Sequence, residues 1–227
     1  GAQFLSAIPP YYFPFGGREI LNYYRALLDV TREGHFLFLY NIPAFVRNSI
    51  PVDVVRELCQ DPRFAGIKDS EGNIQLTQNY LRTLRSPRRV FIGSDDLIAQ
   101  AFTYGAAGSI SGNANVLPEL FVQLYRAKKS GRGDVAQRCQ ELVDQLAEAT
   151  HHGNIPLLKA GLAREAYRWA VLCPPLTRPR LRRRQTSWRR RYAGSRQSLP
   201  KCRIWRAEAR PGFPAGWAAR KINNMAV

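Results

Sequence analysis

A lysine and a tyrosine stand where two apolar segments of the chain end. Lys68 follows the apolar residues 64–67, and Tyr40 closes the continuous apolar run at residues 36–40. A lysine at the end of a buried strand needs a partner for its ammonium group or a lowered pKa. An amine with a lowered pKa attacks a carbonyl carbon to form a Schiff base. A neighbouring phenol moves protons in the carbinolamine step. The two residues therefore predict imine chemistry on a carbonyl substrate.

Simpler interpretations of these residues stay open at this point. Lys68 also fits a strand that leaves the core, with the ammonium reaching solvent. Tyr40 also fits an aromatic side chain that packs under a loop. Tyr11 and Tyr12, after two prolines at the end of another apolar segment, allow the same two interpretations.

A further pair of carboxylates lies at residues 95–96. Asp95 and Asp96 suit acid–base chemistry, but an aspartate at the start of a helix is more often its N-cap. We therefore interpret this pair as a helix cap.

The elements that must position these side chains alternate along the first 165 residues. Apolar runs predict strands, and apolar residues at helical spacing predict helices. We expect strands at residues 2–8, 36–40, 64–67, 90–92 and 108–111, and helices at 18–28, 51–58, 76–84, 96–104, 119–128 and 135–150. Each strand is expected to be buried on both faces, which predicts a parallel sheet in an α/β protein.

The spacing of the strands limits the choice of architecture to two. A β-α repeat of about 25 residues suits a TIM barrel or a doubly wound sheet. No Gly-x-Gly-x-x-Gly or Walker loop follows any of the expected strands, which disfavours a nucleotide-binding sheet.

Composition excludes several classes of protein. With 45% hydrophobic residues among 227, the chain has enough apolar material for a core, and disorder throughout is excluded. Its four cysteines form no Cys-x-x-Cys pair, which argues against a zinc ribbon or a disulfide scaffold. His151 and His152 are adjacent rather than four residues apart, so no metal site is expected. No apolar run approaches the roughly 18 to 20 residues that span a bilayer. We expect a cytoplasmic protein with no membrane partner.

The positive charge of the chain is concentrated after residue 165. Residues 166–227 contain 16 of the 34 Lys and Arg residues but only one of the 17 acidic residues, together with all four Trp. Arginine runs at residues 182–184 and 189–191, interleaved with Trp188 and Tyr192, suit a nucleic-acid-binding arm. The alternative is that this segment was never selected for a function.

Several motifs together resemble one enzyme family. They are IPPYYF (8–13), LYNIP (39–43), GIKDS (66–70), IGSDD (92–96) and GSISGNANVLPEL (108–120). Their order and content resemble the dihydrodipicolinate synthase / N-acetylneuraminate lyase family of class I aldolases, over residues 1 to about 165. The resemblance implies a TIM barrel that acts on 2-oxo acids, usually pyruvate, through a lysine imine. It implies no metal and no organic cofactor, and a homotetramer for the intact enzyme.

The resemblance also implies roles for single residues. Lys68, in GIKDS, would be the Schiff-base lysine, and Tyr40, in YNIP, the proton shuttle that also holds the pyruvyl carboxylate. Tyr12 matches the tyrosine that the family lends to a neighbouring subunit's proton relay. Ser94 and Ile110 match backbone positions that line the pyruvyl pocket.

Two departures from the family pattern bear on the reaction. Phe45 stands where true synthases have the arginine that binds the second substrate's carboxylate, and Arg47 stands where relatives often have glycine. GIKDS is also closer to the 2-keto-3-deoxy sugar acid and 4-hydroxy-2-oxoglutarate aldolases. We therefore expect an aldolase or lyase, with a 4-hydroxy-tetrahydrodipicolinate synthase-type condensation as the alternative.

The resemblance covers only part of a barrel. It begins at the family's fourth strand, so we expect a partial TIM (β/α)8 barrel with strands 4 to 8 and their helices. The family's first three strands carry its proton-relaying threonine, and we expect activity to be impaired without them.

The same resemblance suggests that the basic segment is a stretch of the gene read out of frame. With suitable codons, residues 165–174 read one base out of frame spell Gly-Leu-Pro-Met-Gly-Gly-Pro-Val-Pro, which resembles the family at that place. We therefore divide the chain into a partial aldolase domain at 1–165 and an out-of-frame or disordered tail at 166–227. The alternative is a non-catalytic remnant whose tail binds nucleic acid, a partner that we do not expect.

Overall fold

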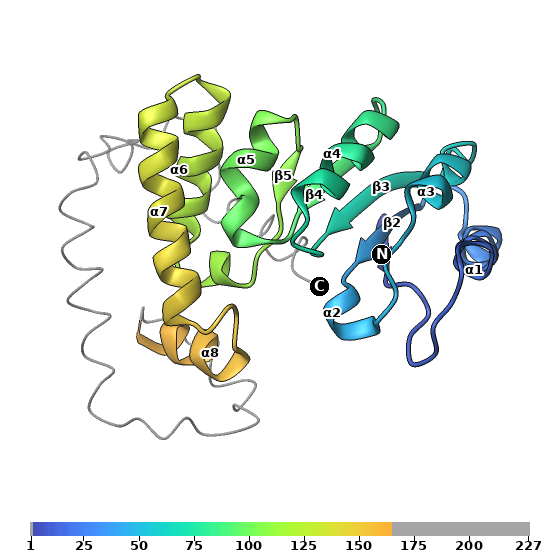
Figure 1. Ribbon diagram of the computed structural model, residues 1–227, viewed down its shortest axis with the longest axis horizontal. Helices are drawn as coiled ribbons and strands as arrows, with labels where there is room; N and C mark the ends of the chain where they lie inside the picture. Colours follow the sequence, from blue (N-terminus) through green and yellow to red (C-terminus); the bar gives the residue numbers. More distant parts are fainter. Residues whose placement is uncertain (1, 165–227) are drawn as a thin grey trace. The chain divides into compact units, whose positions relative to one another are not determined.

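Strands and helices alternate along the chain in the computed structural model, which describes residues 2–164 (Figure 1). The strands are β1 (Phe4–Ala7), β2 (Phe36–Asn41), β3 (Phe64–Asp69), β4 (Arg89–Ile92) and β5 (Gly108–Ser109). They form one sheet in the order β1-β2-β3-β4-β5, and every neighbouring pair is parallel. The parallel α/β architecture expected from the sequence is therefore confirmed. The basic segment at residues 166–227 lies outside the described residues.

The helices follow the strands as expected, with two additions. They are α1 (Gly17–Val30), α2 (Pro43–Val46), α3 (Val52–Leu58), α4 (Ile74–Thr83), α5 (Ile98–Thr103), α6 (Pro118–Lys129), α7 (Gly133–Ala149) and α8 (Ile155–Arg164), with 3-10 turns η1 (Asp95–Leu97) and η2 (Asn113–Asn115). The sequence did not predict α2 or α8. Helix α2 has four residues, which is too short for helical periodicity to be detected.

Helix α8 contains a glycine, which weakens a helix prediction. The structure explains the residue, because a Cβ on Gly161 would lie 2.9 Å from Val116 Cγ1. Glycine therefore allows α8 to pack closely on the segment after β5. Among residues 2–164, none of the helices combines the length and apolar character that crossing a bilayer requires.

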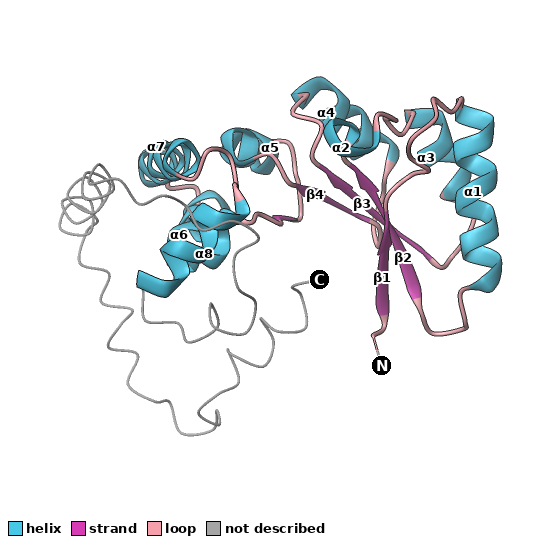
Figure 2. Cartoon of the chain, turned by 90° about the horizontal axis from the view of Figure 1, so that it is seen from below, coloured by secondary structure: helices cyan, strands magenta, loops and turns pink. Residues whose placement is uncertain are grey.

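The core lies between the sheet and its helices. Alternate residues of β2, Leu37 and Leu39, are buried together with Ile67 of β3 and with Ile20 and Tyr24 of α1. Figure 2 shows α1, α3, α4 and α5 on the same side of the row of strands. This face of the sheet is closed by apolar packing, the main source of stability in such a layered fold.

The opposite face of the sheet is lined by aromatic rings and is half-exposed. Phe4 stacks on Phe36 with ring centroids 5.5 Å apart, and Phe38 lies 5.6 Å from Phe91. Phe4 is 58% exposed. The expectation that every strand is buried on both faces is therefore wrong for the described residues. An apolar run shows that both faces are apolar, but it does not show that another element covers each of them.

Gly66 marks an irregularity in the pairing of β2 with β3. Leu37 pairs with Phe64 but Phe38 pairs with Gly66, so Ala65 is an extra residue in β3. Gly66 has φ 144°, and a Cβ there would lie 1.9 Å from the carbonyl oxygen of Arg89 in β4. Only glycine fits between these two backbones.

Replacing Gly66 with alanine should therefore destabilise the protein severely. We expect Gly66→Ala to lower the free energy of unfolding by about 3 kcal/mol or more, because backbone atoms cannot move aside as a side chain would. Gly34→Ala is the matched control, since Gly34 also has positive φ but has no atom within 4 Å of the new Cβ. It should cost only about 1–2 kcal/mol. Urea unfolding measures both, and equal losses would contradict the steric explanation.

Candidate active site

The carboxyl ends of β2 and β3 bring Tyr40 and Lys68 together. The two residues are direct partners in the parallel register. Lys68 Nζ lies 3.9 Å from the centroid of the Tyr40 ring, which is within cation–π distance. Both residues are half-buried on the aromatic face of the sheet. The pair that the sequence analysis singled out is therefore one structural unit.

An aromatic floor adjoins this pair. Phe38 lies two residues before Tyr40 on the same face, and Phe91 is the register partner of Lys68 in β4. Their rings are in tilted contact. A small molecule at Lys68 would rest on apolar surface, with the polar chain ends of the strands at its edge.

A glycine in the next strand's loop makes room for the lysine. A Cβ on Gly93 would lie 3.0 Å from Lys68 Cε and 2.0 Å from Ser70 Oγ. Glycine therefore allows the side chains of Lys68 and Ser70 to lie against the backbone that follows β4.

Ser94 and Ile110 lie at the same edge of the sheet. Ser94 is the N-cap residue of η1, directly after Gly93. Ile110 follows β5, is 38% exposed, and donates its backbone N–H to Ile92 O at 2.9 Å. The parallel ladder thus continues past the strand ends.

Behind Tyr40 and Lys68 lies a polar network, built on the buried residues Asn41, Asp69 and Thr77, that the sequence analysis missed. Asn41 Nδ2 donates to Asp69 Oδ1 and to Glu71 Oε2, both at 2.9 Å. Thr77 Oγ1 donates to Asp69 Oδ2 at 2.6 Å. Burial raises the pKa of Asp69, and the hydrogen bonds from Thr77 and Asn41 offset part of this. One feature of the sequence could have revealed this network: Asn41 stands two residues after Leu39, so its side chain is on the same buried face of the strand.

A second, partly buried network joins the ends of β4 and β5. Asn113 Nδ2 donates to Asp95 Oδ2 at 2.7 Å, and Thr150 Oγ1 donates to Asn113 Oδ1 at 2.7 Å. Burial raises the pKa of Asp95, the hydrogen bond from Asn113 offsets part of this rise, and the charges of Asp96 and Asp144 add to it. The interpretation of Asp95 as a helix cap is wrong, because Ser94 occupies the N-cap position of η1.

Tyr12 lies apart from these networks. It is 76% exposed with φ 80°, and its ring packs edge-on against Phe13 with centroids 4.8 Å apart. In the part of the chain that the structure describes, no hydrogen bond or ring contact joins it to Lys68 or Tyr40. The buried Asn48 holds the loop in place, since its Nδ2 donates to Pro10 O at 2.8 Å and Phe13 O at 2.9 Å.

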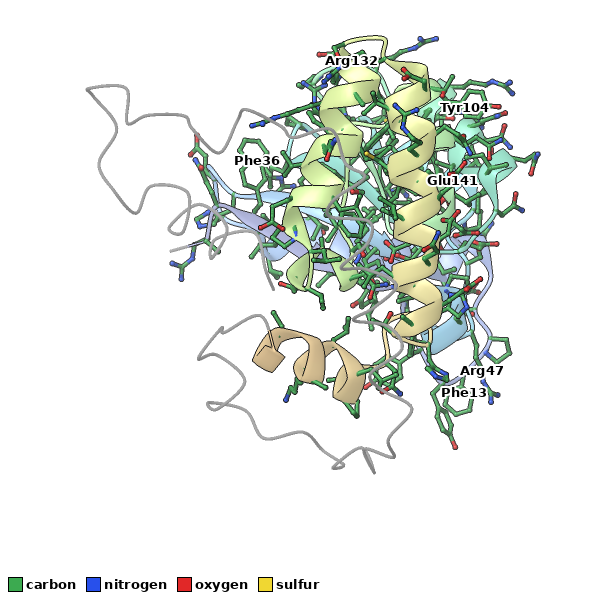
Figure 3. The ribbon with its side chains drawn as sticks, turned by 90° about the vertical axis from the view of Figure 1, so that its left-hand side faces the viewer. Phe13, Phe36, Arg47, Tyr104, Arg132 and Glu141 are labelled. Atoms are coloured by element: carbon green, nitrogen blue, oxygen red, sulfur yellow. The ribbon has the colours of Figure 1, made fainter. Side chains whose placement is uncertain are left out.

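Arg47 lies near this loop and ends α2 in the left-handed conformation, with φ 65°. Figure 3 shows Phe13 and Arg47 at one end of the molecule's described part and Arg132 at the other. A glycine adopts this left-handed conformation without the strain that a side chain meets there. Phe45, on the same short helix, is 82% exposed.

Metal ligands do not gather in this region. Across residues 2–164 there is no group of three or more His, Cys, Asp and Glu side chains placed to hold an ion.

The fold and the site together define a class of protein, the TIM-barrel enzymes. Consecutive parallel β/α units, with a lysine and a tyrosine adjacent at the carboxyl ends of neighbouring strands, form part of a TIM barrel with its polar site at the usual edge. The model of the dihydrodipicolinate synthetase family matches residues 1–187, a range that includes every described residue. The chain belongs to this family, and the resemblance inferred from its motifs is confirmed.

Individual relatives come from several branches of the family. A 2-dehydro-3-deoxy-D-gluconate/2-dehydro-3-deoxy-phosphogluconate aldolase of Thermoproteus tenax is 34% identical over 67% of this chain and 48% of its own length. An N-acetylneuraminate lyase of Rhizobium meliloti is 31% identical over 65% of this chain and 48% of its own. The chain spans about half the length of the curated relatives it matches.

A solved structure confirms the architecture. The dihydrodipicolinate synthase of Bacteroides thetaiotaomicron matches with a TM-score of 0.73 and 26% identity, covering 88% of this chain and 67% of that one. The expected partial TIM barrel is therefore confirmed.

The raised pKa of Asp95 predicts how stability depends on pH. The unfolded chain releases this proton at lower pH than the folded protein, so the free energy of unfolding should fall as pH rises from the ordinary aspartate pKa through the raised one. Asp95→Asn keeps an acceptor for Asn113 and should remove this fall. Urea unfolding between about pH 3 and pH 7 measures it.

Asp134→Asn provides a control of opposite sign. The pKa of Asp134 is lowered mainly by the hydrogen bond from the backbone N–H of Val135, and also by Arg138. The Asp134 carboxylate should therefore add stability as pH rises, and this variant should lose that gain. A change in Asp95→Asn that is equal at every pH would contradict the role of the Asp95 carboxylate.

Proposed function

We propose that the protein is a Schiff-base-forming aldolase or lyase that acts on pyruvate and related 2-oxo acids. The observation that carries the proposal is the 3.9 Å approach of Lys68 Nζ to the Tyr40 ring at the carboxyl edge of the sheet. In TIM-barrel enzymes this edge holds the catalytic groups. The names of the relatives, which include an aldolase and a lyase, support the reaction class.

The chemistry follows from these two side chains. Lys68 Nζ adds to the C2 carbonyl of the 2-oxo acid, and Tyr40 gives its proton to the hydroxyl group that leaves as water. The resulting iminium withdraws electrons, so the C3–C4 bond breaks and its electron pair forms the enamine. The C4 hydroxyl gives its proton to Tyr40 as the aldehyde departs. Protonation at C3 and hydrolysis release pyruvate and restore Lys68.

The proposal extends to three further residues of the site. The backbone at Ser94 and Ile110 would hold the pyruvyl group, and the position of both at the edge that bears Lys68 supports this. Tyr12, exposed on a braced loop, would serve the site of a neighbouring subunit in a homotetramer. The reaction would take place in the cytoplasm and would use no metal or organic cofactor.

Imine trapping tests the proposal. Incubation of the protein with pyruvate and borohydride should place a pyruvyl adduct on Lys68, detected by peptide mass spectrometry. Lys68→Arg should abolish the adduct, because a guanidinium does not form an imine. Tyr40→Phe should keep the site of modification but slow trapping about 100-fold or more, since it removes a general acid. Lys129→Arg, on the exposed end of α6, is the control. An adduct spread over many lysines, or none at all, would contradict the proposal.

The branch of the family depends on Phe45. An apolar ring in place of the family's carboxylate-binding arginine favours cleavage of keto-sugar acids over condensation with a carboxylated aldehyde. In the condensation direction, Phe45→Arg should raise the rate with aspartate semialdehyde about 10-fold or more relative to glyceraldehyde, by supplying a bidentate partner. Phe45→Leu is the control and should leave the ratio unchanged. A synthase-type preference in the parent protein would favour the alternative, 4-hydroxy-tetrahydrodipicolinate synthase-type condensation.

A further inference from the structure

Each strand of the reactive pair carries a buried polar residue directly after its reactive one. Asn41 follows Tyr40 in β2, and Asp69 follows Lys68 in β3. Because successive side chains of a strand point to opposite faces, the reactive pair and the polar pair lie back to back across the sheet. Asn41 and Asp69 are both fully buried.

The polar pair satisfies nearly all of its hydrogen-bonding capacity. Asn41 donates to Asp69 and Glu71, and its Oδ1 accepts the backbone N–H of Ile50 at 3.0 Å. Asp69 also accepts from Thr77 and from the backbone N–H of Glu71 at 3.2 Å. A buried network this complete specifies one arrangement of its members, because any other leaves a polar group unpaired.

No ion pair among the described residues neutralises these carboxylates. The salt bridges in residues 2–164 join Arg25 to Glu57, Arg56 to Asp53, Arg63 to Asp61 and Arg138 to Asp134. The position of Asp69 therefore depends on directional hydrogen bonds, of which the bond from Asn41 is the one that crosses between the strands.

The pairing of these two strands is irregular just before the reactive pair. The pairing of β2 with β3 shifts between Leu37 and Phe38, and Gly66 lies at this irregularity. The shift lies two residues before Tyr40. A slip of one residue would place Tyr40 opposite Ile67 or Asp69 and would turn the reactive side chains away from each other.

We propose that Asn41 and Asp69 are positioning residues, whose amide–carboxylate bond sets the register of β2 on β3 after the irregularity and so holds the Tyr40 ring against Lys68. Their importance for catalysis rests on the proposed function, whereas the geometric effect does not. Neither residue touches the reacting atoms in this scheme.

A double-mutant cycle on amine reactivity tests the proposal without any substrate. Brief acetylation with acetic anhydride, followed by peptide mass spectrometry, gives the rate at Lys68 relative to the exposed Lys129. In the parent protein, Tyr40→Leu should raise this rate about two- to fivefold, because the Tyr40 ring covers the amine and hinders the approach of the reagent. In the Asn41→Ala background, Tyr40→Leu should change the rate by less than about 1.5-fold, since the ring no longer lies on the amine.

Two further variants separate positioning from general loss of stability. Asp69→Asn keeps an acceptor for Asn41 and should retain most of the Tyr40 effect, whereas Asp69→Ala should lose it. Tyr24→Phe removes a buried hydroxyl that donates to Ala7 O at 3.2 Å, outside the polar pair, and should retain the full effect. Where Asn41→Ala does not fold by circular dichroism, Thr77→Val, which removes one bond to Asp69, should reduce the effect partially.

The outcomes distinguish this proposal from the proposed function. A Tyr40→Leu effect of equal size with and without Asn41 would overturn the positioning role. A full effect in Asp69→Ala would do the same. Failure of pyruvate trapping in the parent protein would overturn the aldolase proposal but leave the acetylation cycle valid. If both proposals hold, Asn41→Ala should slow pyruvate trapping at Lys68 while leaving acetylation of Lys129 unchanged.

Discussion

The parallel pairing of β2 with β3 is the constraint on which the rest of the structure depends. Parallel strands place their carboxyl ends at one edge, so two residues distant in sequence, Tyr40 and Lys68, become direct neighbours. The helices that return the chain close the other face of the sheet with apolar packing. The chemistry of the site is thus a consequence of strand direction and register.

The sheet separates two kinds of environment within one backbone. On the helix side, Asn41 and Asp69 are fully buried and joined by a hydrogen bond, and Asp69 also accepts a hydrogen bond from Thr77. On the other side, the half-buried Tyr40 and Lys68 share a face of the sheet with the contacting rings of Phe38 and Phe91. Burying polar groups costs free energy unless they are paired. The helix-side network offsets that cost with hydrogen bonds and confers geometric precision on the reactive side.

The half-exposed aromatic face of the sheet is the face that points to the interior of a barrel in this fold class. The chain belongs to the dihydrodipicolinate synthetase family and spans about half the length of its curated relatives. The five strands within residues 2–164 include the lysine and tyrosine of the proposed reaction. A barrel also encloses its reactive groups from all sides, and this enclosure strengthens electrostatic effects at the amine. Enclosure of the aromatic face would therefore have its largest effect on the reactivity of Lys68.

The sequence by itself determined the alternation of strands and helices, the parallel class of the sheet and the candidacy of Lys68 and Tyr40, because each depends on local apolar patterning or on motif content. The tertiary structure decided what local pattern does not encode. It placed Asn41 and Asp69 together, since a hydrogen bond between residues 28 positions apart leaves no periodic signal. It showed that Asp95 accepts a hydrogen bond from the buried Asn113 and does not cap a helix. It also left one face of the strands half-exposed, because an apolar run records the preference of a residue for burial and not the presence of a covering element.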